Sequence, residues 1–291
     1  MFQGSIVALV TPMTKTGELD ITCLRKLVKL HLDQGTDAIV VNGTTGESPT
    51  TTNKEKLKVI ETVLEVASGQ IPVIAGTGTY STMETIHRTE EAMKLGVDAC
   101  ILVTPYYNKP TQEGLYQHFK AVAEAVPIPQ ILYNVPGRTQ CDLLPATVER
   151  LSHLSNIVGL KEATGDLARG RALKEICGDS FVLLSGDDPS ALAFILQGGK
   201  GVISISSNVV PKKMHEMCKA ALAGDFKRAG EINTPIMQLH KALIVEANPI
   251  PVKWVMHQMG LIEEGIRLPL TPLSEKNRSV VKEAMKEVGL L

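Results

Sequence analysis

Several features are missing from this 291-residue sequence, and each absence argues against a class of protein. No run of 18 apolar residues occurs, which argues against a transmembrane helix. The formal net charge is only -1, from 30 basic and 31 acidic side chains, so no strong field attracts nucleic acid or anionic lipid. With one Trp and five Phe, a stacking surface for single-stranded bases is not expected.

The sequence patterns of metal sites and disulfide scaffolds are also missing. The five cysteines are odd in number and form no Cys-x-x-Cys pair, and the seven histidines form no His-x-x-x-His pair. We therefore expect unpaired, structural cysteines and no metal site. The sequence starts without the basic and apolar regions of a signal peptide, so a reduced, cytoplasmic location is predicted.

Short apolar runs rich in β-branched residues recur along the first two thirds of the chain. None of them alternates cleanly between apolar and polar residues, which is typical of parallel strands buried on both faces. Helical patterns lie between them, and eight such repeats predict a closed (β/α)8 TIM barrel. An open doubly wound sheet is the alternative, but no Gly-x-Gly-x-x-Gly follows the first run. The runs are 5–10, 38–41, 72–75, 99–103, 130–133, 157–160, 181–184 and 201–205.

Helix starts are marked by residues that commonly cap helices. Asp20 and Asn248 are expected N-caps, and the pairs Thr52 with Glu55 and Ser81 with Glu84 match the capping box. After residue 208 the strand pattern stops and only helices are predicted, at 211–223, 225–243, 249–259 and 274–288. One of these helices completes the barrel. We therefore expect a barrel over 1–225 and a C-terminal helical extension over 226–291, packed on the barrel.

The carboxyl ends of the strands carry the chemistry of a TIM barrel, and Lys161 stands out there. It directly follows the apolar run 157–160, so its amine is expected near the barrel mouth. A buried ammonium is costly, and a lowered pKa gives the neutral amine that forms a Schiff base with a carbonyl. The alternative is an ion pair with Glu162 or Asp187.

Other strand ends and loops add polar side chains. Tyr133 and Tyr107 can relay protons if hydrogen bonds position them, and Thr44 can bridge two such groups; alternatively, both tyrosines are core residues with a solvated hydroxyl. Arg138 can hold a carboxylate through two hydrogen bonds, or it is a surface arginine. The glycine-rich stretches 76–78 and 198–201 match no phosphate-binding loop and are interpreted as turns or close approaches.

Three motifs, in order at three strand ends, resemble the signatures of the pyruvate-dependent class I aldolases, the family of dihydrodipicolinate synthase and N-acetylneuraminate lyase. The likeness covers essentially the whole chain and is greater to the dihydrodipicolinate synthase branch. The motifs are Gly43-Thr44-Thr45-Gly46-Glu47, Tyr133-Asn134-Val135-Pro136-Gly137-Arg138-Thr139 and Gly159-Leu160-Lys161-Glu162-Ala163-Thr164-Gly165-Asp166.

This resemblance implies a lyase that condenses pyruvate with L-aspartate 4-semialdehyde to give 4-hydroxy-tetrahydrodipicolinate, the first committed step of lysine and diaminopimelate biosynthesis. Lys161 then forms the imine, without a metal or organic cofactor. Tyr133, Thr44 and Tyr107 match a proton relay in which Tyr107 reaches across a dimer interface. The assembly implied is a homotetramer, a dimer of dimers. The resemblance also assigns the substrate contacts to Thr45, Arg138, Gly186 and Ile203.

The resemblance is incomplete at the site where lysine inhibits some members of the family. Ser48, Glu84 and Tyr106 match that site, whereas Asn53, Lys56 and Tyr80 replace the His, His and Asn typical of inhibited members. Lys56 places a positive charge against a cationic ligand, so weak or absent feedback by lysine is predicted.

Two alternative functions remain open at this point. A sibling aldolase acting on another aldehyde or a sugar acid would share Lys161 and differ in the acceptor pocket. Arg138 favours an acceptor with a carboxylate, because the sialic acid lyase has a small apolar residue at that place. A non-catalytic barrel that binds an oxo acid is less favoured, because the four catalytic residue types are all present.

Overall fold

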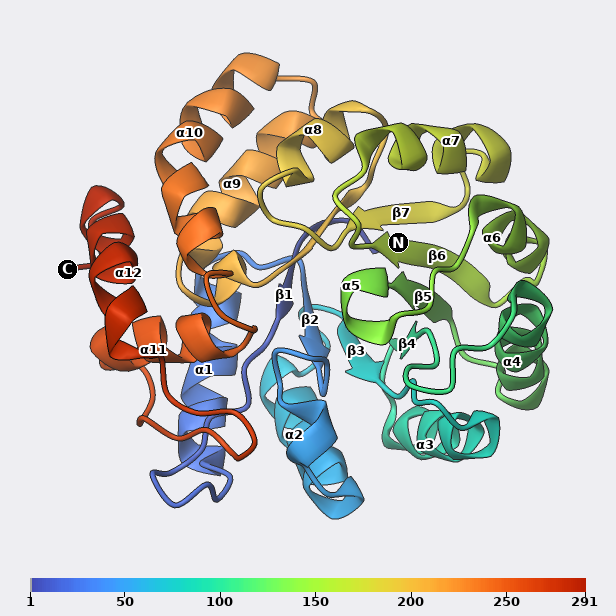
Figure 1. The fold of residues 1–291 in the computed structure, drawn as a ribbon, viewed down its shortest axis with the longest axis horizontal. Helices are drawn as coiled ribbons and strands as arrows, with labels where there is room; N and C mark the ends of the chain where they lie inside the picture. Colours follow the sequence, from blue (N-terminus) through green and yellow to red (C-terminus); the bar gives the residue numbers. More distant parts are fainter. Residues whose placement is uncertain (1) are drawn as a thin grey trace.

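The computed structural model describes residues 2–291 and forms a closed barrel of eight parallel strands (Figure 1). Each strand pairs with the next along the chain, and β8 pairs with β1 to close the ring. The predicted (β/α)8 barrel is therefore confirmed, with strand ends within two residues of the predicted ones. The strands are β1 (Gly4–Ala8), β2 (Ala38–Val41), β3 (Val73–Gly76), β4 (Ala99–Val103), β5 (Gln130–Asn134), β6 (Ile157–Glu162), β7 (Val182–Ser185) and β8 (Gly201–Ser204).

Helices surround the barrel, and short helical turns follow some of the strands (Figure 1). The surrounding helices are α1 (Ile21–Asp33), α2 (Asn53–Ala67), α3 (Thr82–Leu95), α4 (Gln112–Ala125), α6 (Pro145–Ser152), α7 (Leu167–Cys177), α8 (Ala191–Leu196) and α9 (Pro211–Leu222). The short turns are η1 (Ser48–Thr50), α5 (Pro136–Thr139) and η2 (Ser206–Asn208). None of the three short turns was predicted from the sequence.

The predicted caps are found at two helices, found in half at a third and missing at a fourth. Asp20 caps α1, and Thr52 forms the full capping box at α2. Ser81 accepts from the backbone of Glu84, but the Glu84 carboxylate binds Arg88 instead of completing the box. The prediction for Asn248 is wrong, because α11 (Ile250–Gln258) begins one residue later and its N-cap position has no side-chain cap.

Two apolar layers hold the barrel together, one inside the ring of strands and one between strands and helices. The inner layer is formed by side chains such as Ile6, Ile131 and Ile203. Because successive side chains of a strand point to opposite faces, the outward Leu160 places its neighbour Lys161 inside the barrel. The sequence suggested that Lys161 directly follows the strand. The structure extends β6 to residue 162, so Lys161 lies within the strand.

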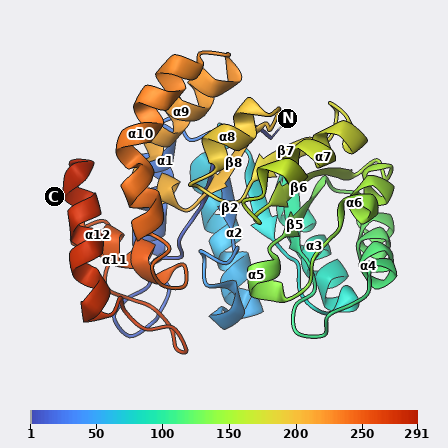
Figure 2. The same cartoon turned by 45° about the horizontal axis from the view of Figure 1, so that its top comes forward.

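The last helices pack beside the barrel. α10 (Phe226–Ala242) contacts α9 and α12 (Glu275–Glu287), and both views show α10, α11 and α12 together on one side (Figures 1 and 2). A buried ion pair from Lys253 in α11 to Glu47 connects them to the loop after β2. The division of the chain at residues 225 and 226 stays a prediction. No helix within residues 2–291 combines the length and the apolar character that crossing a membrane requires.

Candidate active site

A cavity of about 300 Å³ lies at the carboxyl ends of the strands. Its wall combines apolar groups from the barrel with hydroxyl, amine and guanidinium groups. The lining residues that matter for the chemistry are Thr44, Thr45, Tyr133, Arg138, Lys161, Gly186 and Asn248. The structure therefore brings together six of the eight residues predicted for catalysis and substrate binding, and adds Asn248.

Lys161 and Tyr133 form the centre of this cavity. They lie opposite each other on β6 and β5, and the lysine Nζ is 4.3 Å from the centre of the tyrosine ring. Only 8 % of the Lys161 surface is exposed. The strand register therefore presents a buried amine and a phenol to the same small space.

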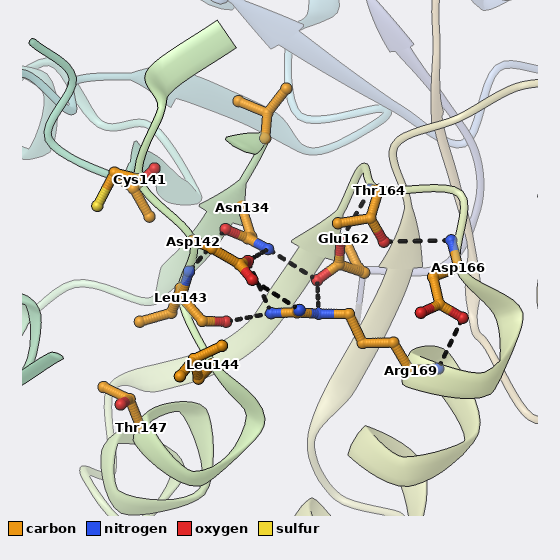
Figure 3. A network of polar contacts seen from close by, with 12 residues as sticks. Asn134, Cys141, Asp142, Leu143, Leu144, Thr147, Glu162, Thr164, Asp166 and Arg169 are labelled. Atoms are coloured by element: carbon orange, nitrogen blue, oxygen red, sulfur yellow. Dashed lines mark hydrogen bonds and ion pairs between the residues drawn. The ribbon is translucent and has the colours of Figure 1, made fainter. Parts of the chain in front are cut away.

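The carboxylate next to Lys161 in the sequence is occupied by other partners (Figure 3). Glu162 accepts hydrogen bonds from Arg169 Nε at 3.0 Å and Asn134 Nδ2 at 3.1 Å on one oxygen. Its other oxygen accepts from the Thr164 amide at 2.8 Å. Glu162 points away from the barrel interior and fixes the end of β6 to α7, so it does not pair with Lys161.

Asp187 was the other predicted ion-pair partner of Lys161. Its Oδ2 accepts from the hydroxyl of Ser190 at 2.5 Å and from the amide of the same residue at 3.1 Å. No ion pair of Lys161 is found in residues 2–291. The ion-pair alternative is therefore wrong, and the amine faces the cavity beside the ring of Tyr133.

Gly186 leaves room for the side chain of Lys161. A Cβ at this position would lie 2.8 Å from Lys161 Cε and 2.6 Å from the Cβ of Ala163. Both distances are shorter than real Cβ contacts, and the lysine stem is held inside the barrel. A side chain at position 186 would therefore displace the amine.

Asn248 connects two predicted binding residues to the segment before α11. Its carbonyl oxygen accepts from Arg138 Nη2 at 3.2 Å, and its Nδ2 donates to Thr45 Oγ1 at 2.9 Å. From the sequence, Asn248 was interpreted as a helix cap, and these contacts were missed. No local signal could have revealed it, since the bonds span 110 and 203 positions of sequence.

Two predicted residues do not reach this cavity with their side chains. Tyr107 is 92 % exposed on the surface, at a backbone φ of 74°. Ile203 packs its side chain into the apolar interior of the barrel and is not part of the cavity lining. The structure of a single chain thus leaves the relay without its second tyrosine.

A second cavity of about 460 Å³ adjoins the first, and the two share Thr44, Tyr133 and Arg138 in their walls. It contains two of the three residues that match the lysine site, Ser48 and Tyr106. Glu84, the third, is bound to Arg88 and is not part of the lining.

Of the three residues that depart from the lysine-site pattern, two line the second cavity and one does not. Lys56 and Tyr80 line the second cavity, and Tyr80 packs edge-on against Tyr106 with ring centres 5.3 Å apart. Asn53 instead donates to Glu91 at 2.8 Å. A lysine and an aromatic ring therefore share this cavity with Ser48 and Tyr106, two of the residues that match the lysine site.

The five cysteines are free thiols, as predicted. In the part of the chain that the structure describes, 2–291, no three His, Cys, Asp or Glu side chains gather in a way that could hold a metal ion. The independence of the reaction from metals and cofactors stays a prediction.

Comparison with known proteins gives the same picture over the full length. The model of the dihydrodipicolinate synthetase family matches residues 1–288. The 4-hydroxy-tetrahydrodipicolinate synthase of Methylococcus capsulatus is 59 % identical over 291 residues, and that of Nitrosococcus oceani is 58 % identical, each match covering 100 % of both chains.

A solved structure extends the agreement to three dimensions. It is the chloride-inhibited dihydrodipicolinate synthase of Acinetobacter baumannii in complex with pyruvate, which is 53 % identical, covers 100 % of both chains and superposes with a TM-score of 0.99. Sequence, fold and the arrangement of the strand ends agree from one end of the chain to the other. The chain therefore belongs to the dihydrodipicolinate synthetase family.

Proposed function

We propose that this protein condenses pyruvate with L-aspartate 4-semialdehyde to give 4-hydroxy-tetrahydrodipicolinate, in the first committed step of lysine and diaminopimelate biosynthesis. One observation carries the proposal. The amine of Lys161 is buried beside Tyr133, has no ion-pair partner in residues 2–291, and faces a cavity that also contains Arg138. The names of the relatives and the pyruvate complex of one of them support the choice of substrates.

The first half of the reaction builds an enamine on Lys161. The Nζ of Lys161 attacks C2 of pyruvate, and loss of one water gives an imine. The imine withdraws electrons, so C3 releases a proton and the enamine forms. In the second half, enamine C3 bonds to the aldehyde carbon of the semialdehyde, whose oxygen takes up a proton. The substrate amine then attacks the imine carbon, closes the ring and releases Lys161.

Each half of the reaction moves protons between the intermediates and solvent. The contact of its ring with Lys161 Nζ supports a part for Tyr133 in this work. We infer that Thr44 and Tyr107 complete the relay, since a hydroxyl both donates and accepts. The high exposure of Tyr107 supports the idea that it enters the cavity of a neighbouring subunit.

The two substrates need separate anion contacts. We assign the pyruvate carboxylate to Thr45, with the backbones of Gly186 and Ile203 lining the same subsite. Arg138 is assigned to the carboxylate of the semialdehyde. Its guanidinium lines the cavity, and within residues 2–291 its one side-chain hydrogen bond goes to a neutral carbonyl, so its charge is free for a bidentate contact.

We infer that at least two chains associate, because a relay that includes Tyr107 is incomplete in one chain, and we take the homotetramer, a dimer of dimers, from the resemblance to the family. A cytoplasmic location fits the five free thiols.

Product formation from the two substrates, followed by mass spectrometry, tests the proposal with Lys161→Ala beside the wild-type protein. The wild-type protein should form the cyclic product, and the variant should be slowed by several orders of magnitude. Borohydride reduction in the presence of pyruvate should add the mass of a reduced adduct to the wild-type chain alone.

Three outcomes would change the assignment. A folded wild-type protein that makes no product but traps pyruvate is an aldolase for another aldehyde. One that neither makes product nor traps pyruvate is a binding protein. Full activity of Lys161→Ala removes the lysine from the mechanism.

A further inference from the structure

The last residues of β5 and β6 form a polar pair next to the two residues at the centre of the cavity. Asn134 and Glu162 are opposite each other in the strand register. One residue earlier, Tyr133 and Lys161 are opposite each other in the same way. Because successive side chains of a strand point to opposite faces, the first pair lies outside the barrel and the second points into the cavity. Each strand therefore carries one residue of the site and one residue of the outer pair.

The outer pair interrupts an apolar layer. Leu132 and Leu160, the preceding outward side chains of the two strands, belong to the apolar layer between strands and helices. Asn134 is fully buried, and the side chain of Glu162 is only 1 % exposed. A carboxylate at such a place is costly unless a positive group and further hydrogen bonds compensate its charge. Polar groups that break the pattern of a core are expected near functional sites, so this pair calls for a functional explanation.

Arg169, on α7, supplies the positive charge (Figure 3). Its Nε donates to Glu162 at 3.0 Å, and its Nη1 donates to Asp142 at 3.0 Å. The amide of Asn134 donates to the same two carboxylates, at 3.1 Å and 2.9 Å. The guanidinium also donates to the carbonyl oxygen of Leu143. One arginine therefore connects the ends of both strands to a helix and to the segment before α6.

We propose that Arg169 is a positioning residue that acts through Glu162 and Asn134. By fixing the last residues of both strands, it keeps the amine of Lys161 at 4.3 Å from the centre of the Tyr133 ring. A planar guanidinium suits this task, because its directed hydrogen bonds fix orientation as well as distance. Arg169 is not part of the cavity lining. The inference rests on the proposed function, in which the amine and the phenol act on the same intermediate.

Borohydride trapping of pyruvate and steady-state kinetics test the proposal in Arg169→Gln. A misplacement of about 1 Å costs up to about 100-fold in rate, so the trapping rate and kcat should fall about 10- to 100-fold. The KM for aspartate semialdehyde should not change, because Arg138, assigned to that substrate, bonds to Asn248 and not to this network. Arg169→Lys keeps a charge beside Glu162 but lacks the planar group, and it should regain part of the lost rate.

Arg25→Gln is the matched control. Arg25 also binds a glutamate with both of its terminal nitrogens, at 2.9 Å and 2.5 Å, but this partner is Glu65 and the contact joins α1 to α2. Neither residue lines either cavity, so the control should keep the wild-type rates.

Thermal melting shows whether each variant is folded. If Arg169→Gln is not, Asp142→Asn decides. The side chain of Asp142 is 37 % exposed, so this change weakens the hold on Arg169 without leaving a buried charge unpaired. It should lower the trapping rate in the same direction by a smaller factor.

Crystal structures of the wild-type protein and the variant measure the distance from Lys161 Nζ to the Tyr133 ring without any reaction, and we expect it to be longer in Arg169→Gln. Wild-type rates in a folded Arg169→Gln overturn the proposal. So does a loss that Arg169→Lys does not relieve and that raises the KM for aspartate semialdehyde equally, because it indicates a general disturbance of the site. A wild-type protein that does not trap pyruvate refutes the proposed function instead, and the measured distance then decides the positioning role.

Discussion

At the scale of single residues, the absence of a side chain at position 186 is a requirement of the site. We predict that Gly186→Ala lowers kcat/KM for pyruvate by about 100-fold, because its Cβ would push Lys161 Cε away from its place. Steady-state kinetics and borohydride trapping measure the effect. Gly137→Ala is the control, since nothing lies within 4 Å of a Cβ there. Equal rates for the two variants would show that the amine is not held where we place it.

Arg138 lines the cavity and is the residue that we assign to the carboxylate of the acceptor. We predict that Arg138→Ala raises the KM for aspartate semialdehyde about 10- to 100-fold, which is the value of a charged hydrogen-bonded contact, and changes the KM for pyruvate far less. Initial rates with each substrate varied in turn give the two constants. Equal effects on both would refute the assigned role.

Lys56 also affects how strongly we expect lysine to inhibit the enzyme. Because a buried ammonium lines the second cavity, we predict that lysine inhibits the enzyme weakly or not at all. Initial rates with added lysine, compared with sodium chloride at the same ionic strength, test this. Half-inhibition at submillimolar lysine would contradict it.

At the scale of elements, a salt bridge fastens the C-terminal helices to α2. Arg267 donates to both oxygens of Glu55, the shorter bond being 2.5 Å, and these hydrogen bonds, followed by those of Thr52, lower the pKa of Glu55 from 4.5 to about 2. A lowered pKa in the folded state means that the stabilisation is complete above pH 4.5 and is lost as the pH falls toward 2.

Glu55→Gln should therefore lower the free energy of unfolding by about 1–3 kcal/mol at pH 7. The difference from the wild-type protein should shrink as the pH falls below the unfolded value of 4.5. Urea unfolding at a series of pH values measures it. Glu61→Gln, an exposed glutamate on the same helix with a weak pairing to Lys58 at 3.6 Å, is the control. If the difference in unfolding free energy between the variant and the wild-type protein grows toward low pH, the ionised carboxylate of Glu55 does not stabilise the fold.

Strands and helix starts could be predicted from the sequence wherever the residues that determine them are close together in the chain. The β-branched runs located all eight strands, and Asp20 and Thr52 mark helix starts because each side chain accepts from the amide three residues away. The short helix α5 escaped prediction, since four residues that include Pro136 and Gly137 look like a turn.

In the candidate site, too, the features with a local signal were predicted and those that depend on distant contacts were not. Lys161 and Tyr133 were found because each belongs to a strand whose end is visible in the sequence. The bonds of Asn248 to Thr45 and Arg138, and that of Glu47 to Lys253, join segments far apart in the chain. Such contacts depend on how the last helices pack on the barrel, and no local pattern records that packing.

At the scale of the whole molecule, the proposed relay needs Tyr107 from a second chain, because this side chain is exposed on the surface of its own chain. We predict that Tyr107→Phe and Lys161→Ala proteins, each nearly inactive, regain activity when they are mixed under conditions that exchange subunits. A mixed dimer has one site with an intact Lys161 and a partner that supplies the intact tyrosine. Random exchange should restore about a quarter of the wild-type rate, since half of the dimers are mixed and each has one complete site.

Mass spectrometry of the intact assembly confirms that exchange has taken place. If the tyrosine acts within its own chain, mixed dimers contain no complete site and the rate stays at the background. That result would place Tyr107 outside the relay of the neighbouring subunit.

The seam between β1 and β8 has a consequence for the synthesis of the chain. Gly201 packs so tightly on Gly4 that a Cβ would lie 2.1 Å from the carbonyl oxygen of Gly4. On the ribosome, β1 is synthesised nearly 200 residues before its partner β8. At usual elongation rates, the interval between the two is roughly 10–40 s. During that time its hydrogen-bonding edge is open to other nascent chains. We expect the early polypeptide to depend on chaperones more than the finished barrel does.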